Sequence, residues 1–354
     1  MSDFSLTLHP ASEGDALVLS WDGHHAVIDL GRTADYHAAR PWLVAASGIE
    51  LFVISHIDAD HIEGAMPMVA EATAPFQPRD VWFNGYGQLV AAKTRIAALE
   101  ALSVDQGEKL TAGIRRFGWP WNLAYGGGPV SVDSQLIGTP VDLAGGLRLT
   151  LLSPSDKELA KLGTVWAAEI AAASLGTGQP DAAPVAPMGY ETLAVMDVEA
   201  LAATPFGADS TAPNGSCIAF LAEFGGKSVL LGADAFPGRI AQSLMALGYG
   251  PQNKLRLDLF KLCHHGSKAN LSPTLLQMLD CTRFAISTDG TRHHHPNPET
   301  MARILINDPG RRKTFYFNTR QPSAEIWDAA ALRDRWQYDC VFPGAGADGL
   351  EVVI

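Results

Sequence analysis

The chain has 354 residues, of which 47% are hydrophobic and 18% are charged, a composition typical of globular rather than disordered proteins. Its 38 acidic residues outnumber 26 lysines and arginines, and the net charge of -12 disfavours a general nucleic-acid coat protein or an electrostatic membrane anchor. No uninterrupted apolar run reaches about 18 residues, the length of a membrane span. Residues 1–10 lack the pattern of a secretory signal, and the four cysteines form no CxxC pair, so we expect reduced thiols in a cytoplasmic protein.

Short β segments fill the beginning of the chain. Asp22-Gly23 separates two strand-like runs and is typical of a hairpin turn. The apolar run 51–55 is of the kind that a sheet buries on both faces. The predicted strands of this part are 4–8, 16–21, 26–30, 51–55 and 81–84, and the predicted helices are 62–72 and 88–117.

The remainder of the chain alternates strands with helices. Residues 176–213 are rich in Ala, Gly, Pro and Thr and are predicted as loop. Because β-rich segments open each half, we expect two packed sheets with helices outside, an αββα sandwich of the α+β class. We expect one domain over residues 1–354, with an inserted helical and loop segment around 85–213. Further predicted strands are 147–152, 218–224, 228–231, 257–263, 284–287, 314–318 and 350–354, and further helices are 156–175, 239–247, 273–279 and one beginning at 299.

The histidines are concentrated in two parts of the chain, and none lies between residues 62 and 263. The densest cluster is His56-Ile-Asp58-Ala-Asp60-His61, which places four potential metal ligands directly after an apolar strand. Imidazoles and carboxylates together suit Zn, Mn or Fe. The competing interpretation is a polar loop in which Asp60 caps a helix. That interpretation would be favoured for a single aspartate, but the His-x-Asp-x-Asp-His spacing favours a metal site.

Three further features follow predicted strands. They are Asp234 in Gly-Ala-Asp, the pair His264-His265, and the histidine run that ends at His295. Each is weak alone, because an aspartate at a strand end is usually a turn residue and histidine runs are often solvated. Together they predict ligands from separate elements that converge on one cleft, as a metal-dependent hydrolase requires.

These motifs resemble the metallo-β-lactamase superfamily, whose signature His-x-His/Asp-x-Asp-His corresponds to residues 56–61. Residues 13–16 and 28–31 resemble the family's opening hairpin with its buried aspartate. His264-His265-Gly266-Ser267 and His295-Pro296 resemble the C-terminal hydrolase domain of the DNA-uptake protein ComEC and phosphorylcholine esterase-like relatives. The motifs extend from residue 13 to about 298, and the membrane channel of ComEC is absent.

The resemblance implies the αββα fold and a dinuclear site holding two divalent ions, Zn or Mn. It implies that Asp234 bridges the ions and that His264 or His295 contacts the substrate or donates a proton, while the adjacent histidines 264 and 265 can exchange roles. Asp60 belongs to both the metal-binding and the catalytic set. The implied ligands are His56 and Asp58 for the first ion and Asp60, His61 and His265 for the second.

The sequence departs from the family in two places. The family's usual middle histidine has no counterpart between residues 62 and 263, so the first ion site is poor in ligands, although Asn214-Gly215-Ser216 resembles a segment seen near that position. The two glycines that follow the signature appear as Glu63-Gly64, which brings a carboxylate close to the cleft.

Charge balance favours a phosphate ester as substrate. Three carboxylates bring about three negative charges against about four positive charges from two divalent ions, which leaves a positive centre. The leading hypothesis is therefore a phosphodiesterase or nuclease that uses a metal-activated water on single-stranded nucleic acid or a nucleotide. One alternative is hydrolysis of a lactone, thioester or β-lactam, of which the β-lactam is least favoured. The other is a degenerate scaffold or sensor subunit of a multi-protein bacterial immune or stress module, with the 85–213 insert binding a protein partner.

Overall fold

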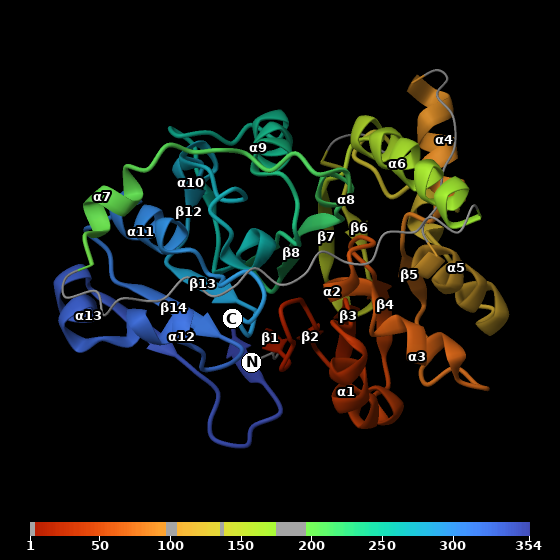
Figure 1. The fold of residues 1–354 in the computed structure, drawn as a ribbon, viewed down its shortest axis with the longest axis horizontal. Coiled ribbons are helices and arrows are strands. Elements are labelled where there is room, and N and C mark those ends of the chain that lie inside the picture. Colours follow the sequence, from red (N-terminus) through yellow and green to blue (C-terminus); the bar gives the residue numbers. More distant parts are fainter. Residues whose placement is uncertain (1–3, 97–104, 135–137, 175–195) are drawn as a thin grey trace.

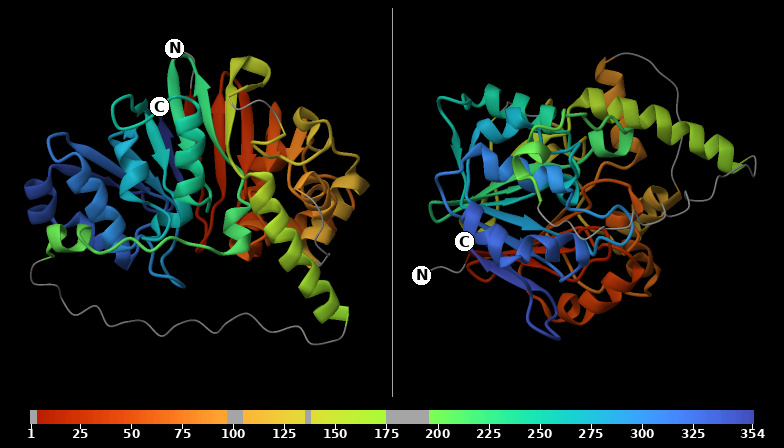
Figure 2. Two further views of the ribbon diagram at one scale, coloured as in Figure 1. Left: turned by 90° about the horizontal axis from the view of Figure 1, so that it is seen from above. Right: turned by 60° about the vertical axis from the view of Figure 1, so that its left-hand side comes forward.

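The molecule consists of two sheets packed face to face, with helices against both outer faces (Figures 1 and 2). This computed structural model describes residues 4–96, 105–134, 138–174 and 196–354. One sheet has six strands and the other has eight. The predicted αββα sandwich of the α+β class is confirmed.

The first sheet has the strand order β16-β1-β2-β3-β4-β5. Strands β1, β2 and β3 form an antiparallel meander, whereas β4 and β5 run parallel to β3. The last strand of the chain pairs with the first, so the two termini lie close together (Figure 1). The bounds are β1 (Phe4–Leu8), β2 (Leu17–Trp21), β3 (His24–Ile28), β4 (Ile49–Val53), β5 (Asp80–Trp82) and β16 (Leu350–Val353).

The second sheet has the order β15-β14-β13-β11-β9-β8-β7-β6. Strands β6, β7, β8 and β9 pair antiparallel with one another, whereas β9, β11, β13, β14 and β15 run parallel. The bounds are β6 (Val141–Asp142), β7 (Arg148–Ser153), β8 (Ala219–Phe224), β9 (Lys227–Leu231), β11 (Leu259–Lys261), β13 (Arg283–Ile286), β14 (Lys313–Phe317) and β15 (Tyr338–Val341). A separate parallel pair joins β10 (Leu255–Arg256) to β12 (Leu279–Asp280).

Alternation along the strands produces the layers, because successive side chains of a strand point to opposite faces of its sheet. In β4, Leu51 and Val53 enter the core between the sheets, and Phe52 enters the core under the helices. In β9, Leu230 packs under the helices of the second sheet, while its two neighbours face the first sheet. Three cores therefore separate four layers.

The helices divide between the two outer cores. Helices α4 and α6 lie side by side over the first sheet, and α9 to α11 cover the second (Figure 1). The helices of the first half are α1 (Thr33–Ala45), α2 (Ala59–Ile62), α3 (Ala65–Ala70), α4 (Tyr86–Ile96), α5 (Asp105–Phe117) and α6 (Asp156–Ser174). The others are α7 (Val198–Ala202), α8 (Ala212–Gly215), α9 (Pro237–Ala246), α10 (Pro273–Gln277), α11 (Pro298–Asn307), α12 (Pro322–Glu325) and α13 (Ala330–Trp336). Four 3-10 turns are η1 (Leu123–Tyr125), η2 (Ala144–Gly146), η3 (Cys263–Gly266) and η4 (Ile326–Asp328).

Several elements differ from those expected. The predicted helix 88–117 is two helices, α4 and α5, and residues 97–104 between them lie outside the described part. The predicted strand 257–263 is shortened to β11, because the chain turns into η3 at Cys263. Helix α1 was not predicted; it contains Pro41, a residue that disfavours a helix interior. Within the predicted loop 176–213, the described residues include helix α7 and the first two residues of α8.

Residues 85–213, predicted as an inserted helical and loop segment, supply strands as well as helices. They contribute β6 and β7 to the second sheet and α4 to α7 to the outer layers. Among the described residues, no helix has both the length and the apolar character needed to cross a membrane. All four cysteines are unpaired.

The core between the sheets should carry much of the stability. Phe220 is 1% exposed and packs edge-on against Trp82 of the other sheet, with ring centroids 5.9 Å apart. We expect Phe220→Ala to lower the free energy of unfolding by about 3–5 kcal/mol, because it leaves a cavity between the sheets. Met245→Ala, at a side chain that is 55% exposed, should change it by less than about 0.5 kcal/mol. Urea denaturation of both variants tests this, and equal effects would contradict it.

Candidate metal centre

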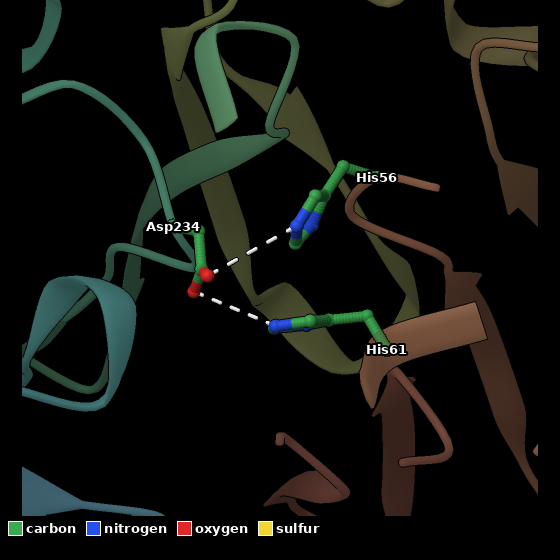
Figure 3. Close-up of side chains that lie close together, drawn as sticks. All are labelled: His56, His61 and Asp234. Carbon is green, nitrogen blue, oxygen red and sulfur yellow. Dashed lines mark ion pairs between the residues drawn. The ribbon is translucent and has the colours of Figure 1, made fainter. Parts of the chain in front are cut away.

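Three of the four sequence features meet at one edge of the sandwich, where strands of both sheets end. The 56–61 segment follows β4, Asp234 follows β9, and His264-His265 follow β11. Because β4 belongs to one sheet and β9 and β11 to the other, the centre lies across the two sheets. His56, His61 and Asp234 point toward one another from these separate elements (Figure 3).

The 56–61 segment does not behave as a helix cap. Asp58 is the residue before α2, but its side chain makes no capping hydrogen bond, and Asp60 lies within that helix. The side chain of Asp58 is 40% exposed and that of Asp60 is 18% exposed, whereas the side chains of His56 and His61 are fully buried. The carboxylates therefore mark the side of the centre that is open to solvent.

Asp234 is the shared partner of four imidazoles. Its Oδ1 lies 3.5 Å from Nε2 of His61 and 3.5 Å from Nε2 of His265. Its Oδ2 lies 3.5 Å from Nε2 of His264 and 4.0 Å from Nε2 of His56. The two oxygens thus face two different pairs of rings.

Asp58 and Asp60 of the 56–61 segment each add a carboxylate to one of these two pairs of rings. Asp60 Oδ2 lies 3.8 Å from Nε2 of His61 and 3.5 Å from Nε2 of His265, on the Oδ1 side of Asp234. Asp58 Oδ2 lies 3.5 Å from Nε2 of His56, on the Oδ2 side. Every residue predicted as a metal ligand is therefore part of this cluster, and each half contains a carboxylate of the segment.

Each ring presents Nε2 to the centre because its Nδ1 is engaged elsewhere. Nδ1 of His61 lies 2.7 Å from Asp29, Nδ1 of His56 lies 3.1 Å from the Ser55 hydroxyl, and Nδ1 of His265 lies 2.9 Å from the Ser287 carbonyl oxygen. Asp29 is itself fixed by the backbone amide and the hydroxyl of Ser55, at 2.7 and 2.6 Å. A carboxylate or carbonyl partner at the second nitrogen is usual for metal-binding histidines.

His264 has a separate set of polar neighbours. Its Nδ1 lies 2.9 Å from Oδ1 of Asn270 and 3.6 Å from Oδ2 of Asp209. Asn270 and Asn214 both donate to the same oxygen of Asp209, at 3.1 and 2.6 Å. Neither Asp209 nor Asn270 is predicted from the sequence, because both lie in segments without a motif.

The backbone at these strand ends is strained. Asp29, Ala233, His264 and His265 all have positive φ, between 41° and 56°. This left-handed region costs L-residues about 1–2 kcal/mol each and concentrates at functional sites. Surrounding contacts hold these residues where the side chains meet.

Burial and charge act against each other in the cluster. Burial disfavours ionisation of Asp234, but the neighbouring imidazoles of His264, His265 and His61 outweigh it and hold the pKa of that carboxyl well below its usual range. Burial likewise opposes protonation of His61, but Asp234, Asp29 and Asp60 hold its pKa well above the usual value. The centre therefore favours paired opposite charges, and a cation can take the place of the ring protons.

The residues fit a metal ion on the evidence of their own atoms. Nε2 of His56 and Oδ1 of Asp234 are buried without a hydrogen-bond partner among the described residues. Ligand atoms of His56, His61 and Asp234 lie within 4.8 Å of one another, as do those of Asp60, His61 and His265. Ligand atoms that each lie about 2.0–2.2 Å from one ion are at most about 4.4 Å from one another, which is close to the separations in these two clusters.

His295 lies beside the centre rather than within it. Its ring centroid is 5.3 Å from that of His264 and 6.4 Å from that of His265. Burial and then the charges of His264 and His265 hold the pKa of His295 well below its usual value. The ring is therefore neutral at physiological pH.

Other charged groups near the opening are engaged with partners. Glu63 accepts a hydrogen bond from Arg32 at 2.7 Å, and burial of its carboxyl is outweighed by that bond, which lowers its pKa. Arg292 lies 3.5 Å from Glu13, and Lys268 lies 2.8 Å from Glu299. The carboxylate that replaces a family glycine thus contacts an arginine and not the cluster.

Comparisons with known proteins find solved structures of low sequence identity. No family profile and no curated protein matches the chain. YhfI of Bacillus subtilis, a metallo-β-lactamase fold protein, is 10% identical, with 100% of both chains covered and a TM-score of 0.44. Zn²⁺-bound PqqB of Methylobacterium extorquens is 12% identical, with 99% of this chain and 100% of that chain covered and a TM-score of 0.45. Igni18, a metallo hydrolase of Ignicoccus hospitalis, is 11% identical, with 99% and 98% covered and a TM-score of 0.40.

The architecture is the αββα sandwich that the resemblance of the motifs to metallo-β-lactamases implied. Its two facing sheets, three cores and outer helices supply the αββα layers of that fold. The family-like motifs lie at the carboxyl ends of β4, β9 and β11, at the edge shared by both sheets.

The charges of the centre predict a pH dependence of stability for metal-free protein. Burial lowers the pKa of His265, but Asp234 and Asp15 outweigh it and raise that pKa to about 9, above the usual 6.5. The protonated ring therefore stabilises the fold fully below about pH 6.5, and this contribution is lost as pH rises through about 9. Urea denaturation of chelator-treated protein between these values should show falling stability, with a shallower slope in His265→Gln. A stability that is constant or rises over this interval would contradict the prediction.

Proposed function

We propose that the protein is a metal-dependent hydrolase that cleaves phosphodiesters, with single-stranded nucleic acid or a nucleotide as substrate. The observation that carries the proposal is Asp234, a buried carboxylate whose two oxygens face two separate pairs of imidazoles. A carboxylate in this position can bridge two cations. Hydrolase chemistry at such a centre agrees with the metallo hydrolases among the structures reported above.

The ligands divide into two half-sites. Asp60, His61 and His265 would hold one divalent ion with Oδ1 of Asp234, and His56 and Asp58 would hold the other with Oδ2. The mixture of carboxylates and imidazoles suits Zn or Mn. A divalent ion there supplies Lewis-acid stabilisation of phosphoryl charge and lowers the pKa of water toward about 7.

Charge supports an anionic substrate. Asp58, Asp60 and Asp234 bring about three negative charges against about four from two divalent ions, leaving a positive opening on an acidic molecule. The other buried aspartates near the centre are already engaged, Asp15 by Lys261 and Asp29 by Ser55 and His61. The overall charge of -12 disfavours long duplex DNA, so a short single strand or a small phosphodiester fits better.

His264 is better placed than His295 to donate a proton to the leaving group. Burial opposes its protonation, but Asp234 and Asp209 outweigh this and raise the pKa of His264. Its Nε2 faces the centre at 3.5 Å from Asp234. His295, whose pKa is lowered by burial, would contact the substrate as a neutral group.

Activity with added metal tests the proposal. Protein loaded with Mn²⁺ or Zn²⁺ should cleave bis-p-nitrophenyl phosphate or a labelled single-stranded oligonucleotide. Asp60→Ala should lower the rate by more than about 100-fold, because it removes a ligand of one half-site. Asp142→Ala should not change it, since that side chain is 73% exposed on β6. Full metal occupancy without cleavage of any phosphodiester would contradict the proposal, and cleavage of lactones or thioesters instead would favour acyl-ester hydrolysis.

A second variant separates proton donation from metal binding. His264→Ala should retain the metal content of the unmodified protein but lower kcat by about 10²–10⁴-fold, as expected for loss of a general acid. A leaving group of low pKa, such as p-nitrophenolate, should be affected less than an alkoxide. Loss of an ion from His264→Ala would show instead that the ring is a ligand. His293→Ala, altering a neighbouring ring outside the cluster, is the control.

A further inference from the structure

A buried lysine lies next to the metal centre, although the proposed chemistry makes no use of it. Lys261 is the last residue of β11, and its side chain is fully buried. Its Nζ donates to Oδ2 of Asp15 at 2.6 Å and to the carbonyl oxygen of Leu262 at 3.2 Å. Asp15, also buried, belongs to the other sheet's loop before β2, so the ion pair joins the two sheets.

The other oxygen of Asp15 faces a predicted ligand. Oδ1 of Asp15 lies 3.4 Å from Nδ1 of His265, whose Nε2 is 3.5 Å from both Asp60 and Asp234. Nδ1 of His265 also lies 2.9 Å from the carbonyl oxygen of Ser287. Lys261, Asp15 and His265 thus form a row that ends at the centre.

The backbone that carries Asp15 is held closely. A Cβ atom at Gly14 would lie 1.7 Å from the carbonyl oxygen of Asp60, so residue 14 has no room for a side chain. The hydroxyl of Ser287 donates to the carbonyl oxygen of Gly14 at 2.8 Å. Asp15 is therefore fixed between the 56–61 segment and the strand ends of the second sheet.

The ammonium group also determines what Asp15 can bind. Ligand atoms of Asp15, Asp234 and His265 lie within 4.8 Å of one another, so Asp15 could itself hold a cation. The Lys261 charge already balances that carboxylate, and a second cation beside the ammonium would be repelled. Asp15 is left as the carboxylate that faces Nδ1 of His265, at 3.4 Å.

We propose that Lys261 is a positioning residue of the metal centre, which holds Asp15 as the orienting partner of His265 and thereby sets the metal affinity of the Asp60–His61–His265 half-site. This inference rests on the proposed metal site but not on any substrate. Partners one step removed from the ion typically contribute 10–100-fold to metal affinity. We therefore expect the charge of Lys261 to affect metal affinity through the side chains of Asp15 and His265.

Binding of Co²⁺ to purified protein tests this without substrate. The visible absorption of bound Co²⁺ reports ligand geometry, and its titration gives the dissociation constant of each ion. We expect Lys261→Met and Asp15→Asn each to weaken binding of one ion by about 10–100-fold and to alter its spectrum. The double variant should bind Co²⁺ about as well as the single variant with the lower affinity, because both substitutions break the same row of contacts.

Lys313→Met is the matched control. Lys313 is also buried, on β14, where its Nζ donates to the carbonyl oxygens of Asp308 and Arg311. Its replacement should lower stability while leaving both Co²⁺ constants and spectra unchanged. If Lys261→Met does not fold, Asp15→Asn alone carries the test.

The outcomes separate the two proposals. Unchanged or tighter Co²⁺ binding by Lys261→Met, or by Asp15→Asn where that variant carries the test, would overturn the positioning role and leave the proposed function standing. Failure of the unmodified protein to bind Co²⁺ would overturn both. Weakened binding by the two variants but not by Lys313→Met would support the role whatever the substrate.

Discussion

The structure depends on one buried carboxylate and the four imidazoles that face it. Asp234 is 2% exposed, and such a group is stable in a protein interior only if opposite charge surrounds it. The rings supply that charge from the ends of two strands, β4 and β11, and a cation between them would satisfy the atoms that lack partners. Asp29, Ser287 and Asn270 orient the rings. The chemistry proposed for the protein follows from this one arrangement.

The fold makes the arrangement possible by uniting two sheets at one edge. Parallel strands of both sheets end there, so β4 delivers the 56–61 segment opposite β9 and β11. Three apolar cores hold the layers in register, and the strained residues Ala233, His264 and His265 are held by contacts around them. Lys261 and Asp15 add an ion pair between the sheets directly beside the centre. Stability of the sandwich and geometry of the site are thus coupled.

The sequence was informative where a local pattern carries a physical requirement. Alternating or continuous apolar runs predicted most strands, and the spacing of residues 56–61 predicted a ligand segment at a strand end. The helix α1, with Pro41 inside it, and the break between α4 and α5 were missed, since tertiary packing overrides local propensity. Asp209 and Asn270 were missed because long-range contacts alone bring them to His264. Lys261 did leave a signal, a lysine within an apolar strand, whose meaning required the position of Asp15.

The central claim is that cations occupy both sides of Asp234. Anomalous diffraction from crystals grown with Mn²⁺, measured at an energy selective for that element, tests it most directly. The account predicts two peaks about 3.5–4 Å apart, one beside His61 and His265 and one beside His56, each in bonding range of Asp234. Peaks absent from this edge of the sandwich, with the side chains unchanged at saturating Mn²⁺, would contradict it.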